Sequence, residues 1–321
     1  MGALKNITVA AGLLAVAGIG ETVYFYNRTM KRGNAKTERT TKMSGTDWAK
    51  YFPLMEERKV FVMEQPHRDV YITSFDGLKL HATYFPALHT ENDDATCIKK
   101  AVICFHGYTG EGLSNHIAIA DYFLKQGYAM LLPDARAHGE SEGEYIGFGC
   151  LDRKDALSWI QWLIQESGED IQILLHGTSM GGATVLMTSG LELPDNVKGI
   201  ISDCGFTSPK EVFTHVLNTM YHLPAFPAIQ GADFLNKKLA GYGMDECNAK
   251  REVQKATVPI LFIHGSADTF VPCSMCHEIY ENCQSPKRKL IIEDAAHAES
   301  YYKDMETYEN SLTEFAKECL A

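Results

Sequence analysis

The strongest constraint on the fold is a repeated alternation of short apolar runs and longer helix-like stretches. The apolar runs, which we interpret as strands, lie at residues 101–106, 128–134, 171–175, 197–203, 258–264 and 289–294. Continuous apolar strands separated by helices are typical of a parallel sheet that is covered on both faces. The sequence therefore predicts an α/β fold with a mostly parallel, doubly wound sheet. Ligands of such sheets bind at the carboxyl ends of the strands.

Two segments depart from this alternation. Residues 68–86 contain two β-rich runs on either side of Asp76-Gly77, which predicts an antiparallel hairpin at the edge of the sheet. Residues 207–250 contain no β-rich run and are rich in Tyr, Phe, Pro and Leu, which predicts an inserted helical cap over the strand ends. A longer crossover made of ordinary core helices is the alternative for this second segment.

The first 45 residues have a composition of their own. Residues 7–26 carry a single charge and are about long enough to cross the hydrocarbon core of a bilayer. Residues 28–42 follow with six basic residues and one acidic residue, a local charge of +5. Positive charge after the apolar run favours an uncleaved membrane anchor, residues 1–27, and a basic linker, residues 28–45, that leads to a cytoplasmic domain, residues 46–321. A cleaved signal peptide and a buried helix are the alternatives.

Charge and cysteine content exclude several other classes of protein. The net charge of −11 argues against a nucleic-acid partner, which would require a basic face. The nine cysteines are odd in number and scattered, so they do not resemble a disulfide framework. Cys273 and Cys276 have C-x-x-C spacing, but the available further ligand, His277, is adjacent to Cys276 in a predicted helix. We therefore expect no metal and no cofactor.

The stretch ILLHGTSMGGATVL, residues 173–186, contains a candidate nucleophile. An apolar run is followed by G-T-S-M-G and then by small residues that can begin a helix, which is the context of a G-x-S-x-G nucleophile elbow. The glycines of this motif allow a sharp strand-to-helix turn in which a Cβ would collide with neighbouring backbone. Ser179 is therefore the predicted nucleophile, and an ordinary serine at a helix start is the alternative for the motif taken by itself.

A serine hydroxyl needs a base within hydrogen-bond reach, and the base needs a third group that orients it. His297 lies in a loop of small residues just after the last predicted strand, whereas His277 lies within a predicted helix. We therefore expect His297 to be the base. Asp268 follows the end of the strand at residues 258–264 and is the expected acid, with Asp203 as its competitor.

Acyl transfer also needs hydrogen-bond donors directed at the developing oxyanion. The predicted donors are the backbone N–H groups of Met180, which follows the nucleophile, and of Tyr108 in the loop HGYTG, residues 106–110. His106 is expected to make structural hydrogen bonds. Three polar residues of the loop after the next strand are expected to brace the elbow: Arg136, His138 and Ser141.

Together these motifs resemble the α/β-hydrolase superfamily, and they occur in its order from about residue 68 to the C-terminus. They are the elbow GTSMGG, the loop HGYTG, the segment DARAHGES, the loop GSADTFVP and the late histidine. Within the superfamily the chain is similar to the serine-aminopeptidase-like and monoacylglycerol-lipase-like branch, and there to bacterial membrane-anchored members. Ala137 stands where many relatives carry glycine. The resemblance implies the α/β-hydrolase fold and a catalytic triad of Ser179, Asp268 and His297.

The expected function is a serine hydrolase that cleaves carboxylic esters through an acyl-enzyme. The aromatic content of the predicted cap favours apolar acyl groups, and the expected substrate contacts are Phe206, Phe213, Tyr221 and Phe226. An aminopeptidase or amidase is the first alternative, but residues 207–244 contain only Glu211 and Asp233 to hold a substrate amine. A non-catalytic binding protein of the same fold is the second alternative, although such proteins usually lack a member of the triad.

Overall fold

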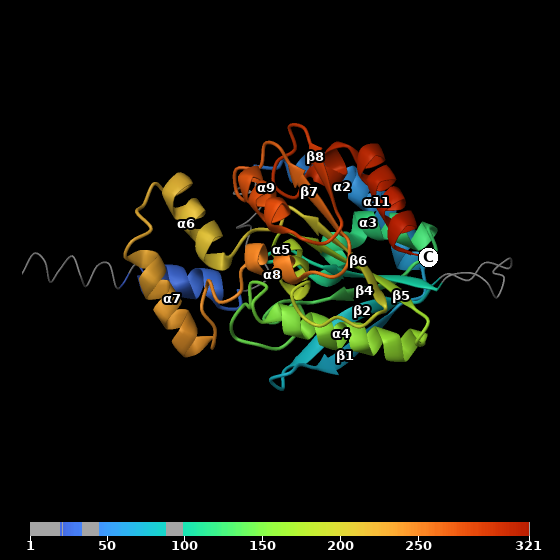
Figure 1. Ribbon diagram of the computed structural model, residues 1–321, viewed down its shortest axis with the longest axis horizontal. Coiled ribbons are helices and arrows are strands. Elements are labelled where there is room, and N and C mark those ends of the chain that lie inside the picture. The colour runs from blue at the N-terminus through green and yellow to red at the C-terminus, as the bar shows by residue number, and fades with distance from the viewer. Residues whose placement is uncertain (1–19, 21, 34–44, 88–98, 321) are drawn as a thin grey trace, which may run out of the picture.

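The computed structural model describes residues 20, 22–33, 45–87 and 99–320 (Figure 1). Its strands form an eight-stranded sheet in the order β1-β2-β4-β3-β5-β6-β7-β8. The strands are β1 (Arg68–Thr73), β2 (Lys79–Phe85), β3 (Lys100–Phe105), β4 (Ala129–Pro133), β5 (Gln172–Thr178), β6 (Val197–Asp203), β7 (Ile260–Gly265) and β8 (Lys287–Ile292). The β1–β2 and β2–β4 pairs are antiparallel and the others are parallel, so the predicted hairpin lies at the edge of a mostly parallel sheet.

The central strands are apolar throughout because both faces of the sheet are buried. Neighbouring side chains of a strand point to opposite faces. Ile103 and Leu175 therefore join the hydrophobic core on one face, whereas Val102 and Leu174 join the core on the other. This arrangement confirms the predicted doubly wound α/β fold.

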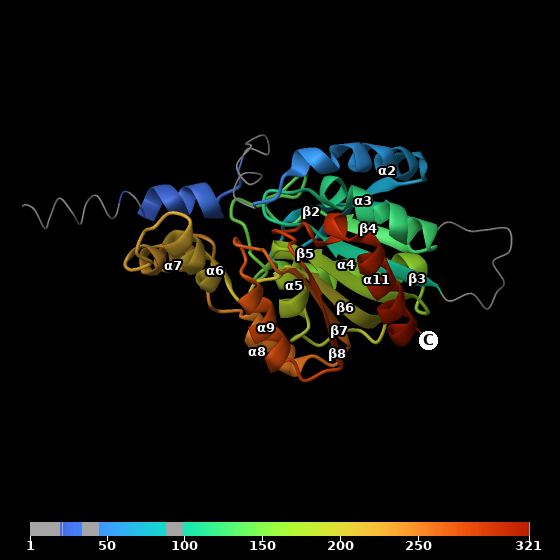
Figure 2. The same cartoon turned by 90° about the horizontal axis from the view of Figure 1, so that it is seen from above.

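Helices cover both faces (Figure 2). Helices α4 (Asp152–Ser167), α5 (Met180–Thr188), α8 (Ala249–Glu252) and α9 (Cys273–Asn282) pack on the first core. Helices α2 (Phe52–Glu64), α3 (Gly112–Lys125), α10 (Ser300–Lys303) and α11 (Met305–Cys319) pack on the second. Two short 3₁₀ helices, η1 (Trp48–Tyr51) and η2 (Val253–Lys255), precede α2 and follow α8.

The segment predicted as a cap lies between β6 and β7. It contains α6 (Pro209–Thr219) and α7 (Ala228–Leu239), which lie to one side of the sheet in both views (Figures 1 and 2). Helix α6 begins where Ser208 accepts a hydrogen bond from the backbone N–H of Glu211, with Pro209 in the first turn. Ser208 is a typical N-cap residue, and proline is favoured in the first turn because its missing N–H costs nothing there.

Residues 22–30 form a helix that packs against protein. The side chains of Tyr26 and Met30 are only 1% and 0% exposed. The Tyr26 hydroxyl donates a hydrogen bond to the side-chain oxygen of Asn236 on α7 over 3.2 Å. Tyr26, the last residue of the predicted membrane span, is therefore buried in the protein interior.

This placement corrects the predicted membrane anchor. The described part of the chain contains no helix that is long and apolar enough to cross a membrane. The transmembrane assignment of residues 7–26, and the localisation inferred from it, are therefore wrong. The error arose because an apolar run has the same composition whether lipid or protein buries it. Residues 7–19 and 21 of the predicted span lie outside the described residues.

Candidate active site

Ser179 lies at a sharp turn between β5 and α5. Its backbone has φ 57° and ψ −111°, a conformation that is unfavourable for a residue with a Cβ. A Cβ on Gly177 would lie 2.1 Å from the carbonyl oxygen of Gly181, and a Cβ on Gly181 would lie 1.8 Å from that of Phe105. Both positions therefore require glycine, and the turn has the strained geometry expected of a nucleophile elbow.

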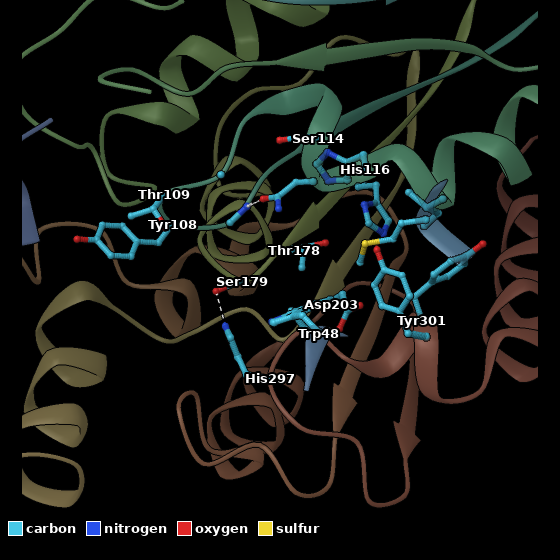
Figure 3. Close-up of a pocket in the computed structure, with 18 of the residues that line it drawn as sticks. Trp48, Tyr108, Thr109, Ser114, His116, Thr178, Ser179, Asp203, His297 and Tyr301 are labelled. Carbon is cyan, nitrogen blue, oxygen red and sulfur yellow. Dashed lines mark hydrogen bonds between the residues drawn. The ribbon is translucent and has the colours of Figure 1, made fainter. Parts of the chain in front are cut away.

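The three residues predicted as a triad are brought together at the carboxyl ends of the strands. The Ser179 Oγ lies 2.8 Å from the Nε2 of His297 (Figure 3), and the Nδ1 of His297 lies 2.7 Å from the Oδ2 of Asp268. All three residues are buried, with 5% to 6% of their surface exposed. This arrangement allows His297 to accept the serine proton while the Asp268 carboxylate orients its ring.

Asp268 is held as a carboxylate by several donors. Its Oδ1 accepts hydrogen bonds of 2.9 Å from the backbone N–H groups of Phe270 and Val271. The Nε2 of His264 lies 3.3 Å from its Oδ2, beside the bond from His297. Burial acts to raise the pKa of Asp268, but the two histidines outweigh it and hold this pKa below its ordinary value. Asp268 is therefore ionised at neutral pH and can orient the base.

Asp203, the competing acid, ends β6 and has other contacts. Its carboxylate accepts a hydrogen bond from the Tyr308 hydroxyl over 3.1 Å, and burial raises its pKa to about 6. Its backbone carbonyl accepts a hydrogen bond of 2.8 Å from the N–H of Ser179. Asp203 therefore supports the backbone of the elbow, and the residue whose carboxylate reaches His297 is Asp268.

The loop after β3 passes directly beside the nucleophile. A Cβ on Gly107 would lie 3.5 Å from the Cβ of Ser179, so the two backbones approach closely. Tyr108 follows Gly107 in this loop, and Met180 follows Ser179 in the elbow. Both residues predicted to supply oxyanion donors therefore lie at the nucleophile.

Two buried histidines brace this loop. The backbone N–H of Ala135 donates to the Nε2 of His106 over 2.9 Å, so the Nδ1 carries the proton and donates to the Gly107 carbonyl over 2.7 Å. The Nε2 of His138 accepts a hydrogen bond of 3.2 Å from the N–H of Thr109. Burial lowers the pKa of both rings, that of His138 to about 3, so each stays neutral and keeps one acceptor nitrogen. Of the three residues expected to brace the elbow, His138 thus supports the loop at residues 106–110.

Two cavities meet at Ser179. The larger, of about 310 Å³, is bordered by polar groups that include His176, Asp203 and His297. The smaller, of about 150 Å³, is lined mainly by apolar side chains, and most of its aromatic side chains come from Phe25, Tyr26, Phe148, Phe206, Phe213 and Tyr221. Tyr108 and Phe270 border both cavities. The nucleophile therefore lies between a larger cavity of mixed polar and apolar lining and a smaller, mainly apolar one.

Of the four predicted substrate contacts, Phe206, Phe213 and Tyr221 line the apolar cavity. Phe226 lies between α6 and α7 and is 70% exposed. Sequence analysis missed Phe25 and Tyr26, because these residues were assigned to the membrane anchor. The signal that could have found them is the presence of three aromatic residues among the four residues 23–26.

The cysteine pair singled out in the sequence lies at the start of α9. The Sγ of Cys273 is 3.7 Å from the Nε2 of His277, whose Nδ1 is 3.0 Å from the Nζ of Lys289. Within the described residues, one group of potential metal ligands lies close enough together to hold a single ion. It consists of Cys204, Asp268 and His297. The aspartate and histidine of that group already bond to each other within the triad.

Sequence comparisons place these features in a known family. Residues 100–226 match the family described as the alpha/beta hydrolase fold. The chain is 33% identical over 214 residues to the uncharacterized protein YqkD of Bacillus subtilis, a match that covers 67% of this chain and 70% of the relative. It is 26% identical over 250 residues to the uncharacterized protein YfhR of Escherichia coli K12, which covers 77% of this chain and 79% of the relative.

Two solved structures share the fold. The Pyrococcus furiosus esterase Pf2001 has a TM-score of 0.63 at 24% identity, over 81% of this chain and 93% of the esterase. The Pyrococcus horikoshii acylaminoacyl peptidase has a TM-score of 0.58 at 16% identity, over 81% of this chain and 43% of the peptidase. The predicted superfamily is confirmed, whereas the branch within it stays a prediction. The chain belongs to the alpha/beta hydrolase fold family.

Proposed function

We propose that this protein is a serine hydrolase that cleaves carboxylic esters of medium-length apolar acyl groups through an acyl-enzyme on Ser179. The observation that carries the proposal is the hydrogen-bonded series Ser179–His297–Asp268 at the border of an apolar cavity. The triad supplies an activated nucleophile, and the cavity supplies a site for an apolar group bonded to the reacting carbonyl.

In the first half of the reaction, the Ser179 Oγ attacks the ester carbonyl while the Nε2 of His297 takes the hydroxyl proton. The carbonyl oxygen becomes an oxyanion that the backbone N–H groups of Tyr108 and Met180 stabilise. As the intermediate collapses, His297 returns the proton to the leaving alcohol, and the acyl group stays on Ser179. In the second half, a water molecule attacks the acyl carbonyl while His297 takes one of its protons. When the resulting tetrahedral intermediate collapses, the bond to the Ser179 Oγ breaks, His297 returns the proton to that oxygen, and the carboxylic acid leaves.

The two cavities suit the two parts of an ester. We assign the apolar cavity to the acyl chain and the larger, more polar cavity to the leaving alcohol and the attacking water. An apolar protein cavity of about 150 Å³ is large enough to hold benzene, a molecule of six carbons. The cavity bordering Ser179 has about this volume, so an acyl tail of about six carbons would fill it.

Amide or aminoacyl hydrolysis is less well supported by the site. A substrate amine needs a carboxylate near the reacting centre, and the described residues that line the apolar cavity include no acidic side chain. Asp203 borders the larger cavity, but its carboxylate already accepts a hydrogen bond from Tyr308.

A series of p-nitrophenyl esters from acetate to dodecanoate, compared with aminoacyl arylamides, tests the proposal on the purified full chain. We expect kcat/KM to rise from acetate to hexanoate or octanoate, because each buried methylene adds roughly 0.8 kcal/mol of binding. A steady fall from acetate to octanoate would contradict the assignment of the apolar cavity to the acyl chain. Faster cleavage of the arylamides would favour the aminopeptidase alternative.

A further inference from the structure

Residues 22–30 form one wall of the apolar cavity. Five of them border it: Thr22, Phe25, Tyr26, Arg28 and Thr29. This helix lies beside α7 in both views (Figures 1 and 2), and a Cβ on Gly231 of α7 would lie 2.8 Å from the Thr22 side chain. The cavity is therefore enclosed by the cap helices on one side and by a segment from the start of the chain on another.

Phe25 closes the cavity against the cap. Its ring packs edge-to-face on that of Tyr221, with 5.7 Å between the ring centroids. Its neighbour Tyr24 is 59% exposed and does not border the cavity. The rings of Tyr24 and Phe25 contact each other edge-to-face, with 5.6 Å between centroids, but of the two it is Phe25 that borders the cavity, so each is varied alone.

The same segment also holds the oxyanion loop. The Tyr108 hydroxyl donates a hydrogen bond of 3.1 Å to the backbone carbonyl of Thr29. The Tyr108 ring stacks on Phe148, with 5.4 Å between the centroids. The loop residue that is proposed to stabilise the oxyanion is therefore attached, through its side chain, to the wall of the cavity.

Further contacts secure the segment to the body of the protein. The backbone N–H of Arg32 donates to the Glu144 carbonyl, and that of Ile146 donates to the Met30 carbonyl, both over 2.8 Å. The Arg32 guanidinium donates to the carbonyls of Gly139 and Ser141. The two backbone hydrogen bonds fix residues 30–32 against residues 144–146, which precede Phe148 in the same loop.

We propose that residues 22–32 are a specificity element of the active site, in which Phe25 sets the length of acyl chain that the enzyme accepts. The Tyr108–Thr29 hydrogen bond makes Tyr108 a positioning residue, because it ties the oxyanion loop to the same element. The inference rests on the proposed ester hydrolysis. It adds that residues 22–32 and the cap together complete the proposed acyl site.

The test compares Phe25→Ala with Tyr24→Ala in the full chain, on p-nitrophenyl acetate and octanoate. Phe25→Ala should lower the octanoate-to-acetate ratio of kcat/KM about tenfold, because two methylenes of the chain lose their apolar wall. Tyr24→Ala should leave the ratio unchanged. Phe25→Trp, which narrows the cavity, should shift the preferred ester to a shorter chain. Circular dichroism and the rate of labelling by a fluorophosphonate establish that each variant is folded with an intact nucleophile.

Tyr108→Phe tests the positioning role, since it keeps the ring and the backbone N–H and removes the hydroxyl that bonds to Thr29. We expect kcat to fall about fivefold for every ester, with the chain-length ratio unchanged. If Phe25→Ala and Tyr24→Ala give the same ratio, or if Phe25→Trp keeps the original optimum, the specificity element is refuted although ester hydrolysis stands. If the wild-type chain cleaves no ester, the proposed function fails before this comparison begins.

Discussion

The triad and the walls of the apolar cavity are held by different kinds of contact. Ser179, His297 and Asp268 each follow a strand of the same sheet and are joined by hydrogen bonds of 2.8 and 2.7 Å. The cavity walls come from segments far apart in the sequence and meet through aromatic rings. The ring centroids of Phe148 and Phe213 lie 5.0 Å apart, and those of Phe25 and Tyr221 lie 5.7 Å apart.

This difference determines what a substitution can do in each region. Hydrogen bonds weaken steeply with small changes in distance and angle, whereas apolar contact is non-directional and follows the area buried. Loss of a triad side chain should therefore stop the reaction with every substrate. Loss of a cavity side chain should change which acyl group is preferred and leave the chemistry intact.

The largest effect is expected for Ser179→Ala. This variant should lose labelling by a fluorophosphonate, and its turnover should fall by several powers of ten for every ester, because Ser179 carries the hydroxyl that bonds to the Nε2 of His297. Gel-based labelling and ester kinetics measure the two effects, with Ser158→Ala on α4 as a control that should label normally. Covalent labelling of the Ser179→Ala protein would place the nucleophile elsewhere.

The next effect separates the two candidate acids. Asp268→Asn should lower kcat by about 10⁴-fold, because an amide cannot hold the imidazole in the tautomer that accepts the serine proton. Asp203→Asn should cost far less, since Asp203 contacts Tyr308 and the elbow backbone. Steady-state kinetics of both variants on one ester decides the order. The reverse ranking would transfer the role of the acid to Asp203.

Protonation of Asp134, which directly follows β4, should lower the free energy of unfolding at acid pH. Burial acts to raise the pKa of this residue, but hydrogen bonds from His81 and from the backbone N–H of Gly112 and Glu140 lower it to about 2. Because the folded-state pKa is below the ordinary value of 3.8, the stabilisation is present above about pH 4 and is lost as the pH falls toward 2. Asp134→Asn should therefore lower the free energy of unfolding by about 2 kcal/mol at pH 7.

The difference between Asp134→Asn and the wild type should narrow between about pH 4 and pH 2, where the wild-type carboxylate takes up its proton. Urea unfolding at several pH values measures this difference. A difference that stays constant across this range would mean that the charge of Asp134 is not what stabilises the fold.

The smallest effect is expected for the cap residue Phe213, which lines the apolar cavity. Phe213→Ala should lower the octanoate-to-acetate ratio of kcat/KM about tenfold, because Phe213 lines the apolar cavity. Phe226→Ala is the matched control, since that ring is 70% exposed, and it should leave the ratio unchanged. Equal ratios for the two variants would show that the cap aromatics pack the cap without selecting the acyl chain.

The proximity of Ser179 and His297 could be predicted from the sequence because its signals are local. The elbow is encoded by glycines whose Cβ atoms would collide with backbone, and His297 stands in a short loop directly after the last strand. The order of apolar runs likewise predicted the sheet, since a parallel strand buried on both faces must be apolar throughout. Asp203 ends one strand and Asp268 follows another, so the sequence left both as candidates, and the folded geometry shows which carboxylate reaches His297.

The residues that line the apolar cavity could not be predicted in the same way, because the cavity depends on contacts between distant segments of the chain. Phe213 and Phe226 have the same side chain and lie in the same insertion, but Phe213 lines the cavity that borders Ser179, whereas Phe226 is 70% exposed. Residues 22–26 were assigned to the membrane span because their composition does not show what buries them. The partners of Tyr26, which are Tyr145 and Asn236, lie more than a hundred residues later in the chain.

The contact between Tyr26 and Asn236 spans 210 residues, which has a consequence for the nascent chain. A ribosome adds about 5–20 residues per second, so Tyr26 waits roughly ten to forty seconds before its partner is synthesised. Throughout that interval the apolar side chains of residues 22–30 lack the cap helix α7 against which they pack. The wall of the apolar cavity that these residues form can therefore be completed only after the cap has been synthesised.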